Sequence, residues 1–156
     1  MNLFFSGDTI MDSVRDLDDK RLIKQILECQ TLLRISLGEQ SGYAKHPVAV
    51  YYAKHPLFLA NYGLYACIEY SNRFGKTHKL ESEFANVWFN YLVDVSKVYE
   101  IVPPIYVEGS KKDKNCIRTT ENVQELFRNK LKNKWRYDKY PPKWTLVGAP
   151  KWLKGV

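Results

Sequence analysis

The sequence predicts a mainly α fold: a compact, single-domain helical bundle over residues 1–156 with an irregular, aromatic and basic C-terminal tail. Three observations indicate this fold class. Apolar residues recur at the 3.6-residue period of a helix in several segments. Prolines and glycines stand where those segments end. With 156 residues, of which 45% are hydrophobic, the chain is long and apolar enough for one core.

The N-terminal part is expected to hold one long helix. After an extended lead-in over residues 1–7, this helix runs from Ser13 or Asp16 to about Leu37. Apolar side chains repeat along it at helical spacing. The segment 38–42 contains two glycines and breaks the helix.

Two His-Pro pairs then bracket a short helical stretch between Pro47 and His55. Proline fits the first turn of a helix and disfavours helix in the residue before it. The next helix is therefore expected from Pro56 to about Phe74, ending near Gly75.

The segment Glu83–Tyr99 has the clearest helical pattern in the chain. Its apolar positions form one stripe that is assigned to core packing: Phe84, Val87, Trp88, Tyr91, Leu92 and Val95. Pro103 and Pro104 end this helix, and a polar loop follows over residues 105–119.

A last helix is expected from Thr119 or Thr120 to about Trp135. Its apolar stripe is formed by Val123, Phe127 and Leu131. The proline-rich segment 140–156 cannot continue as a regular helix, so its aromatic side chains are expected to dock on the body of the protein.

The long N-terminal helix carries an unusual charged face. Leu22, Ile26, Cys29 and Leu33 share one stripe, and the opposite side presents Lys20, Arg21, Lys24 and Glu28. A carboxylate flanked by cations stays ionised and oriented, as a site that stabilises developing positive charge requires. The alternative is a solvated helix face with ordinary ion pairs four residues apart.

Charge is unevenly distributed along the chain. Residues 1–110 have a net charge of −2, whereas residues 111–156 have +9 and three of the four tryptophans. Cations neutralise phosphates and aromatic rings stack on bases, so this pattern favours a nucleic-acid partner. The candidate binding residues here are Lys130, Lys134, Trp135 and Trp144. The alternative is a solubilising lysine-rich tail whose tryptophans pack on the core.

The middle of the chain supplies a second group of polar side chains. Tyr62, Glu69 and Arg73 project from one side of their predicted helix, and Tyr43, His46, Lys76 and His78 lie in the flanking segments. Hydrogen-bonding aromatics beside one acid and one arginine suit a planar polar ligand such as a flipped base. The alternative for Glu69 and Arg73 is a solvent-exposed ion pair.

The composition also bears on metal sites, cofactors, cellular location and membrane spans. Three histidines without ligand spacing do not make a metal site, and no cofactor is expected. Three widely spaced cysteines are expected to be reduced thiols, which places the protein in the cytoplasm, that of the host cell if a phage encodes it. No apolar run is long enough for a membrane span, so no membrane partner is expected.

The charged helix also resembles a helix of a known protein family. Its residues Leu17, Asp19, Arg21, Leu22 and Glu28 are similar to the first-helix signature of the phage pyrimidine-dimer DNA glycosylases of the endonuclease V type. The later turn with Gly42, Tyr43, His46 and Pro47 and the aromatic, basic C-terminus also look similar to that family.

The resemblance implies a helical protein that extrudes a damaged pyrimidine from duplex DNA and cleaves its glycosidic bond without a cofactor. It implies that Glu28 is the catalytic carboxylate and that Arg21 contacts phosphate. The family's nucleophile is an α-amine exposed by trimming of the initiator methionine. Here Asn2 is too bulky for the usual trimming, so the corresponding amine is expected to be that of Met1, with Lys20 or Lys24 as the alternative source of an amine.

Two functions from different classes follow. The first is a DNA repair glycosylase with AP lyase activity on damaged pyrimidines. The second is a non-catalytic phage protein of the same fold that binds nucleic acid or a nucleotide messenger. The retained Glu28 favours the first function and Asn2 favours the second, while the oligomeric state stays open.

Overall fold

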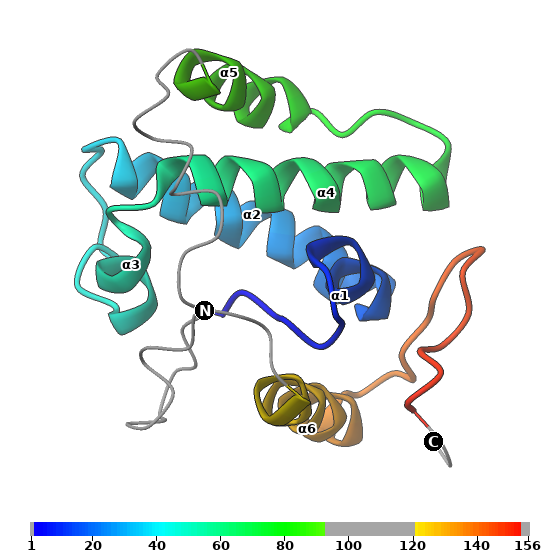
Figure 1. The fold of residues 1–156 in the computed structure, drawn as a ribbon. Coiled ribbons are helices and arrows are strands. Elements are labelled where there is room, and N and C mark those ends of the chain that lie inside the picture. The colour runs from blue at the N-terminus through cyan, green and yellow to red at the C-terminus, as the bar shows by residue number, and fades with distance from the viewer. Residues whose placement is uncertain (1, 93–120, 154–156) are drawn as a thin grey trace.

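The computed structural model describes residues 2–92 and 121–153 (Figure 1). Within these residues the chain forms six helices and no strand, which confirms the mainly α, compact fold. No described helix is both long and apolar enough to cross a membrane. The helices are α1 (Ile10–Asp16), α2 (Asp19–Ser36), α3 (Pro47–Tyr52), α4 (Pro56–Phe74), α5 (Glu81–Leu92) and α6 (Glu121–Tyr137).

The long N-terminal helix of the sequence prediction is wrong in one respect, because the structure divides it into α1 and α2. Leu17 and Asp18 between them adopt extended backbone conformations, with ψ angles of 135° and 161°. Thr9 caps α1 by accepting a hydrogen bond from the Asp12 amide. Leu17 is completely buried, so the break between the two helices lies at a core residue. The extended backbone there changes the direction of the chain before α2 begins.

The two helices that follow have the boundaries expected from the prolines. α3 begins at Pro47, and the ring of His46 caps it by accepting from the Val48 amide at 3.2 Å. α4 begins at Pro56 and ends at Phe74, and the capping residue Gly75 has a φ of 66°. Glycine adopts this left-handed conformation at little cost, which explains why the helix stops there.

α4 is the central helix of the fold. It packs against α2 on one side and α5 on the other (Figure 1). A Cβ atom at Gly63 would lie 2.3 Å from the Phe84 ring, so α4 and α5 approach this closely only because residue 63 is glycine. On α5, Phe84 is buried, Val87 and Trp88 are half-buried and Phe89 is exposed. The rest of the predicted stripe and the expected helix end at Tyr99 lie outside the residues whose burial the structure describes.

The N-terminal segment, residues 2–7, is part of the core. It runs between α6 and the α2–α4 pair (Figure 1), with Leu3, Phe4 and Phe5 all buried. The ring of Phe127 on α6 meets those of Phe4 and Phe5 edge-on at 5.9 and 5.7 Å between centroids. The N-terminal segment therefore links α6, near the end of the chain, to α2 and α4.

α6 buries the stripe that its sequence predicts, consisting of Val123, Phe127 and Leu131, and it also buries Trp135. The expected polar loop at 105–119 and the expected helix start at Thr119 or Thr120 lie outside the described residues.

The segment 138–153, which contains no helix or strand, docks on the junction of α1 and α2 through indole N–H groups. Trp152 Nε1 donates to Asp16 Oδ2 at 2.7 Å, and Trp144 Nε1 donates to the Asp16 carbonyl at 3.0 Å. Trp135, at the end of α6, donates to Asp18 Oδ1 at 2.8 Å. Burial raises the pKa of the Asp16 carboxyl above its usual value, against the hydrogen bonds that lower it.

Thr145 attaches the same segment to the first residue of α2. Its amide donates to Asp19 Oδ1 at 3.0 Å and its hydroxyl donates to Oδ2 at 2.5 Å. Burial acts to raise the pKa of Asp19, but the hydrogen bonds from Thr145 and Arg73 outweigh it and hold that pKa below its usual value. The acids at the start of α2 therefore serve as acceptors for the C-terminal segment.

Candidate functional site

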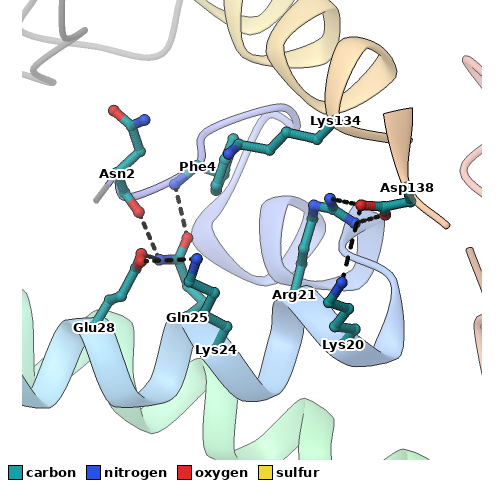
Figure 2. A pocket seen from close by; sticks show the side chains of 9 residues that line it. All are labelled: Asn2, Phe4, Lys20, Arg21, Lys24, Gln25, Glu28, Lys134 and Asp138. Atoms are coloured by element: carbon teal, nitrogen blue, oxygen red, sulfur yellow. Dashed lines mark hydrogen bonds and ion pairs between the residues drawn. The ribbon is translucent and has the colours of Figure 1, made fainter. Parts of the chain in front are cut away.

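A pocket of about 240 Å³ opens between α2, the N-terminal segment and the end of α6 (Figure 2). It lies on the charged face of α2, opposite the buried stripe of that helix. Lys134 reaches toward it from α6 (Figure 2). Its lining residues are Asn2, Phe4, Lys20, Arg21, Lys24, Gln25, Glu28, Lys134 and Asp138.

Glu28 is the carboxylate nearest the N-terminal segment in this pocket. Its side chain is 18% exposed, and Lys24 Nζ lies 3.7 Å from its Oε1. Gln25 Nε2 lies 3.5 Å from its Oε2. The carboxylate thus has a cation on one side and an amide donor on the other, and it remains accessible to a ligand.

Arg21 is held at the other end of the pocket. It donates to both carboxylate oxygens of Asp138, at 2.6 and 2.9 Å, and it also lies 3.2 Å from Asp18. The hydrogen bonds from Arg21 hold the pKa of Asp138 below its usual value. Two acids therefore compensate the charge of Arg21, a residue predicted to contact phosphate.

Lys20 and Lys24 contribute most of the exposed positive charge on the α2 side of the pocket. Their side chains are 75% and 66% exposed, against 11% for Arg21. Lys134 adds a third exposed cation from α6. Long exposed ammonium groups at the edge of a pocket can follow the phosphates of a flexible anionic ligand.

The N-terminal segment reaches the Glu28 side of the pocket. The Asn2 carbonyl accepts a hydrogen bond from Gln25 Nε2 at 2.6 Å, and Asn2 itself lines the pocket. Met1, predicted to supply the amine, lies outside the described residues.

Gln25 is a pocket residue that was not among the predicted site residues. It is 2% exposed, and both ends of its carboxamide are hydrogen-bonded. A signal was available in the sequence: the residue lies at the edge of the apolar stripe of α2, where an amide without a partner would be costly.

The structure buries Tyr62, Glu69 and Arg73, which were predicted to suit a planar polar ligand. Arg73 donates to Glu69 Oε1 at 2.9 Å and to Asp19 Oδ1 at 3.1 Å. Tyr62 and Glu69 have no exposed surface, and Arg73 is 2% exposed. The Glu69–Arg73 pair is therefore a buried ion pair and not a solvent-exposed one, and Arg73 joins α4 to the start of α2.

The other residues predicted from the middle of the chain lie apart from the Glu28 pocket. Tyr43 is 59% exposed on the turn before α3, and His46 caps that helix. Lys76 is exposed after α4, whereas His78 is 8% exposed and accepts from the Leu80 amide at 3.1 Å. None of these four is among the residues that line the pocket.

The four candidate binding residues of the basic region 111–156 do not all line the pocket. Lys134 lines the pocket, and Lys130 lies half-buried one turn before it on α6. Trp135 is buried, and its ring centroid is 5.2 Å from that of Trp144. Both indoles donate to acceptors at the α1–α2 junction, so they help to hold the C-terminal segment in place.

The pocket thus combines two carboxylates, Glu28 and Asp138, with cations from two helices of one helical protein. The family model of the pyrimidine dimer DNA glycosylases matches residues 1–82, more than half of the chain. The chain therefore belongs to this family. No curated protein and no solved structure matches it. The matched part contains Asn2, Gln25 and Glu28, while Lys134 and Asp138 lie beyond it.

Proposed function

We propose that this protein is a DNA glycosylase that removes damaged pyrimidines from duplex DNA and cleaves the resulting abasic site, with the chain acting as one domain. The observation that supports this most strongly is the meeting of the N-terminal segment with Glu28 in one pocket. Residues more than twenty positions apart come together there, and both lie in the part that matches the family.

The proposed reaction begins with attack of a neutral α-amine on C1′ of the damaged nucleotide. The C1′–N bond breaks, and its electron pair leaves with the base, which takes up a proton. Opening of the sugar at O4′ gives a Schiff base between the amine and C1′. Loss of a proton from C2′ then expels the 3′-phosphate and cleaves the strand.

Glu28 has the role of stabilising the cationic intermediate and handling protons. Its carboxylate is 18% exposed and lies between Lys24 and Gln25, so it can face a ligand in the pocket without being buried. A preorganised charge of opposite sign at the place where positive charge develops lowers the barrier.

Phosphate binding is assigned to Lys20, Lys24 and Lys134. These side chains are exposed at the edge of the pocket. Lys20 and Lys24 lie 3.9 and 3.7 Å from Asp138 and Glu28, whereas the less exposed Arg21 lies 2.6 Å from Asp138 and also pairs with Asp18. Arg21 then acts mainly by holding the end of α6 against α2. Sequence-independent attraction of this kind positions DNA and does not select the lesion.

Borohydride trapping on DNA that carries an abasic site tests the proposed activity. Reduction of a Schiff base leaves a covalent protein–DNA adduct, and we expect one with the protein bearing its free Met1 amine. Appending a short uncleaved tag before Met1 should remove the adduct while DNA affinity stays within a few fold. A lysine with an ordinary pKa is almost wholly protonated at pH 7, which is why the α-amine is the expected nucleophile.

The second candidate is a non-catalytic binder of nucleic acid or of a nucleotide. Asn2 favours it, because this residue opposes the usual exposure of an amine at position 2. DNA binding without any adduct or strand cleavage would support this function. An adduct with equal yield from the tagged protein would instead make Lys20 and Lys24 the next candidates for the nucleophile.

A further inference from the structure

Gln25 lies where the N-terminal segment, α2 and α4 meet. Its Oε1 accepts from the Phe4 amide at 3.1 Å, and its Nε2 donates to the Asn2 carbonyl at 2.6 Å. The Tyr62 hydroxyl lies 3.1 Å from the same Oε1 and 2.9 Å from the Phe4 carbonyl. The remaining contact, 3.5 Å from Nε2, is Glu28 Oε2.

The backbone fixes the direction in which this amide points. The Phe4 N–H group can only donate and the Asn2 carbonyl can only accept, so Oε1 must face Phe4 and Nε2 must face Asn2. An ionised glutamate has nearly the same shape as glutamine but offers only acceptors. Gln25 is therefore matched to the N-terminal segment by its chemistry as well as by its size.

Gln25 is also the more rigid of the two side chains next to Glu28. Its amide is buried, whereas the Lys24 side chain is 66% exposed and lies 3.7 Å from the carboxylate. A buried side chain with several hydrogen bonds keeps one rotamer and can hold a neighbouring group in a fixed position.

We infer that Gln25 is a positioning residue, which holds the N-terminal segment and Glu28 at fixed positions relative to each other across the pocket. This inference rests on the proposed function, because it concerns the two groups assigned to the reaction. Displacing a reacting group by about 1 Å can cost on the order of 10² in rate even when the mutated residue does not touch the substrate.

The variant Gln25→Glu tests the inference by keeping the shape and removing the donor. We expect its rate of borohydride trapping to fall by about 10²-fold, with DNA affinity within a few fold. A second carboxylate beside Glu28 disfavours ionisation of both, so the acidic limb of the pH–rate profile should move to higher pH. The limb would stay in place if position 25 did not lie beside a carboxylate that titrates in the reaction.

Gln30→Glu is the matched control on the same helix. Gln30 Nε2 donates to Glu83 Oε2 at 2.6 Å, so this variant also loses a strong hydrogen bond and gains a charge, but away from the pocket. It should trap DNA at the wild-type rate and with the wild-type pH profile. Wild-type rate and profile in Gln25→Glu would overturn the inference.

Tyr62→Phe separates positioning from loss of stability. It removes the buried hydroxyl beside the Phe4 carbonyl but leaves the contacts of Gln25 with Asn2 and Glu28. Comparing the variants at temperatures where each is equally folded should show a much smaller rate loss in Tyr62→Phe than in Gln25→Glu. Equal losses at equal folded fraction would overturn the inference.

Hydrogen exchange provides a measurement that does not depend on catalysis. In Gln25→Leu the amides of residues 2–8 should exchange faster than in the wild type, while α4 and α5 keep their protection. If the wild-type protein gives no adduct at all, the proposed function fails, and exchange still tests the anchoring. Unchanged exchange over residues 2–8 would overturn the role of Gln25 by itself.

Discussion

At the residue scale, the surroundings of two glutamates on neighbouring helices decide what each can do. Glu69 has no exposed surface and is paired with Arg73 at 2.9 Å, so its charge is compensated by Arg73 inside the protein. Glu28 is partly exposed and borders the pocket. Sequence alone cannot separate them, because both are acids on amphipathic helices with a basic residue four positions away.

Glu28→Gln should abolish most of the proposed activity and leave binding intact. Removing a charge that stabilises the transition state costs about 10²–10³ in rate, whereas the neutral amide leaves the surrounding cations unchanged. Single-turnover cleavage and DNA affinity, measured in parallel, check this expectation.

Glu39→Gln is the control for that substitution, since Glu39 lies on an exposed loop, 3.9 Å from Arg34, and does not line the pocket. It should behave as the wild type. Full activity in Glu28→Gln would remove Glu28 from the mechanism.

At the element scale, the pocket depends on α2 and α6 lying on either side of the N-terminal segment. α2 contributes Lys20 and Lys24, and α6 contributes Lys134 (Figure 2). The core contacts of Phe127 with Phe4 and Phe5 fix the distance between these helices. The charge pattern of the pocket is therefore a consequence of aromatic packing beneath it.

Replacing Lys20, Lys24 and Lys134 together with glutamine should weaken DNA binding and its dependence on salt. The slope of log affinity against log salt should decrease by roughly 0.9 for each phosphate contact that is lost. Titrations at several salt concentrations measure this slope.

The triple variant of Lys45, Lys54 and Lys79 is its matched control, because it removes the same charge from exposed positions that do not line the pocket. Its slope should stay close to that of the wild type. Equal slopes for the two triple variants would mean that binding follows net charge and not the pocket.

Gly63→Ala tests the contact between α4 and α5. Alanine favours helix over glycine by about 1 kcal/mol, but its Cβ would lie 2.3 Å from the Phe84 ring. Overpacking of this kind costs about 1–3 kcal/mol, so we expect a net loss in the free energy of unfolding.

Gly42→Ala provides the comparison for Gly63→Ala, because no atom lies within 4 Å of a Cβ built at Gly42. Denaturant unfolding should show little change for this variant. A Gly63→Ala protein as stable as the wild type would show that α5 can move away at no cost.

At the scale of the whole molecule, the C-terminal segment closes the fold by returning to the start of α2. Trp152 lies 136 positions from Asp16 in the sequence, and Arg128 stacks over the Trp152 ring at 5.4 Å. The acids of the α1–α2 junction are therefore occupied by the tail, the end of α6 and Arg73, whereas Lys20, Lys24 and Glu28 of α2 border the pocket.

Trp152→Phe should destabilise the protein in a pH-dependent way. The indole N–H stabilises the ionised form of the Asp16 carboxylate, whose pKa burial has raised. Losing this hydrogen bond should cost about 1–3 kcal/mol where Asp16 is ionised. The difference between variant and wild type should shrink as pH falls through the folded-state pKa of Asp16, since the protonated form depends less on the donor.

Trp144→Phe is a control with the same chemical change and no titrating partner. Its indole donates to the Asp16 backbone carbonyl at 3.0 Å, so the destabilisation should be similar at each pH. Unfolding measured between pH 3 and pH 7 compares the two. A parallel pH dependence for both variants would contradict the assignment to Asp16.

The sequence by itself determined α3, α4 and the face of α2 that carries charge, but not the break between α1 and α2. The bounds Pro56–Phe74 and the buried stripe of α6 follow from local signals, because capping and helical periodicity act between residues at most a few positions apart. Only the tertiary structure decided which polar groups became partners. Whether Arg21 meets a phosphate or Asp138, 117 positions away, depends on which segments the core brings together, and no local pattern encodes that choice. The same holds for Gln25, whose amide is satisfied only because the N-terminal segment folds back over α2.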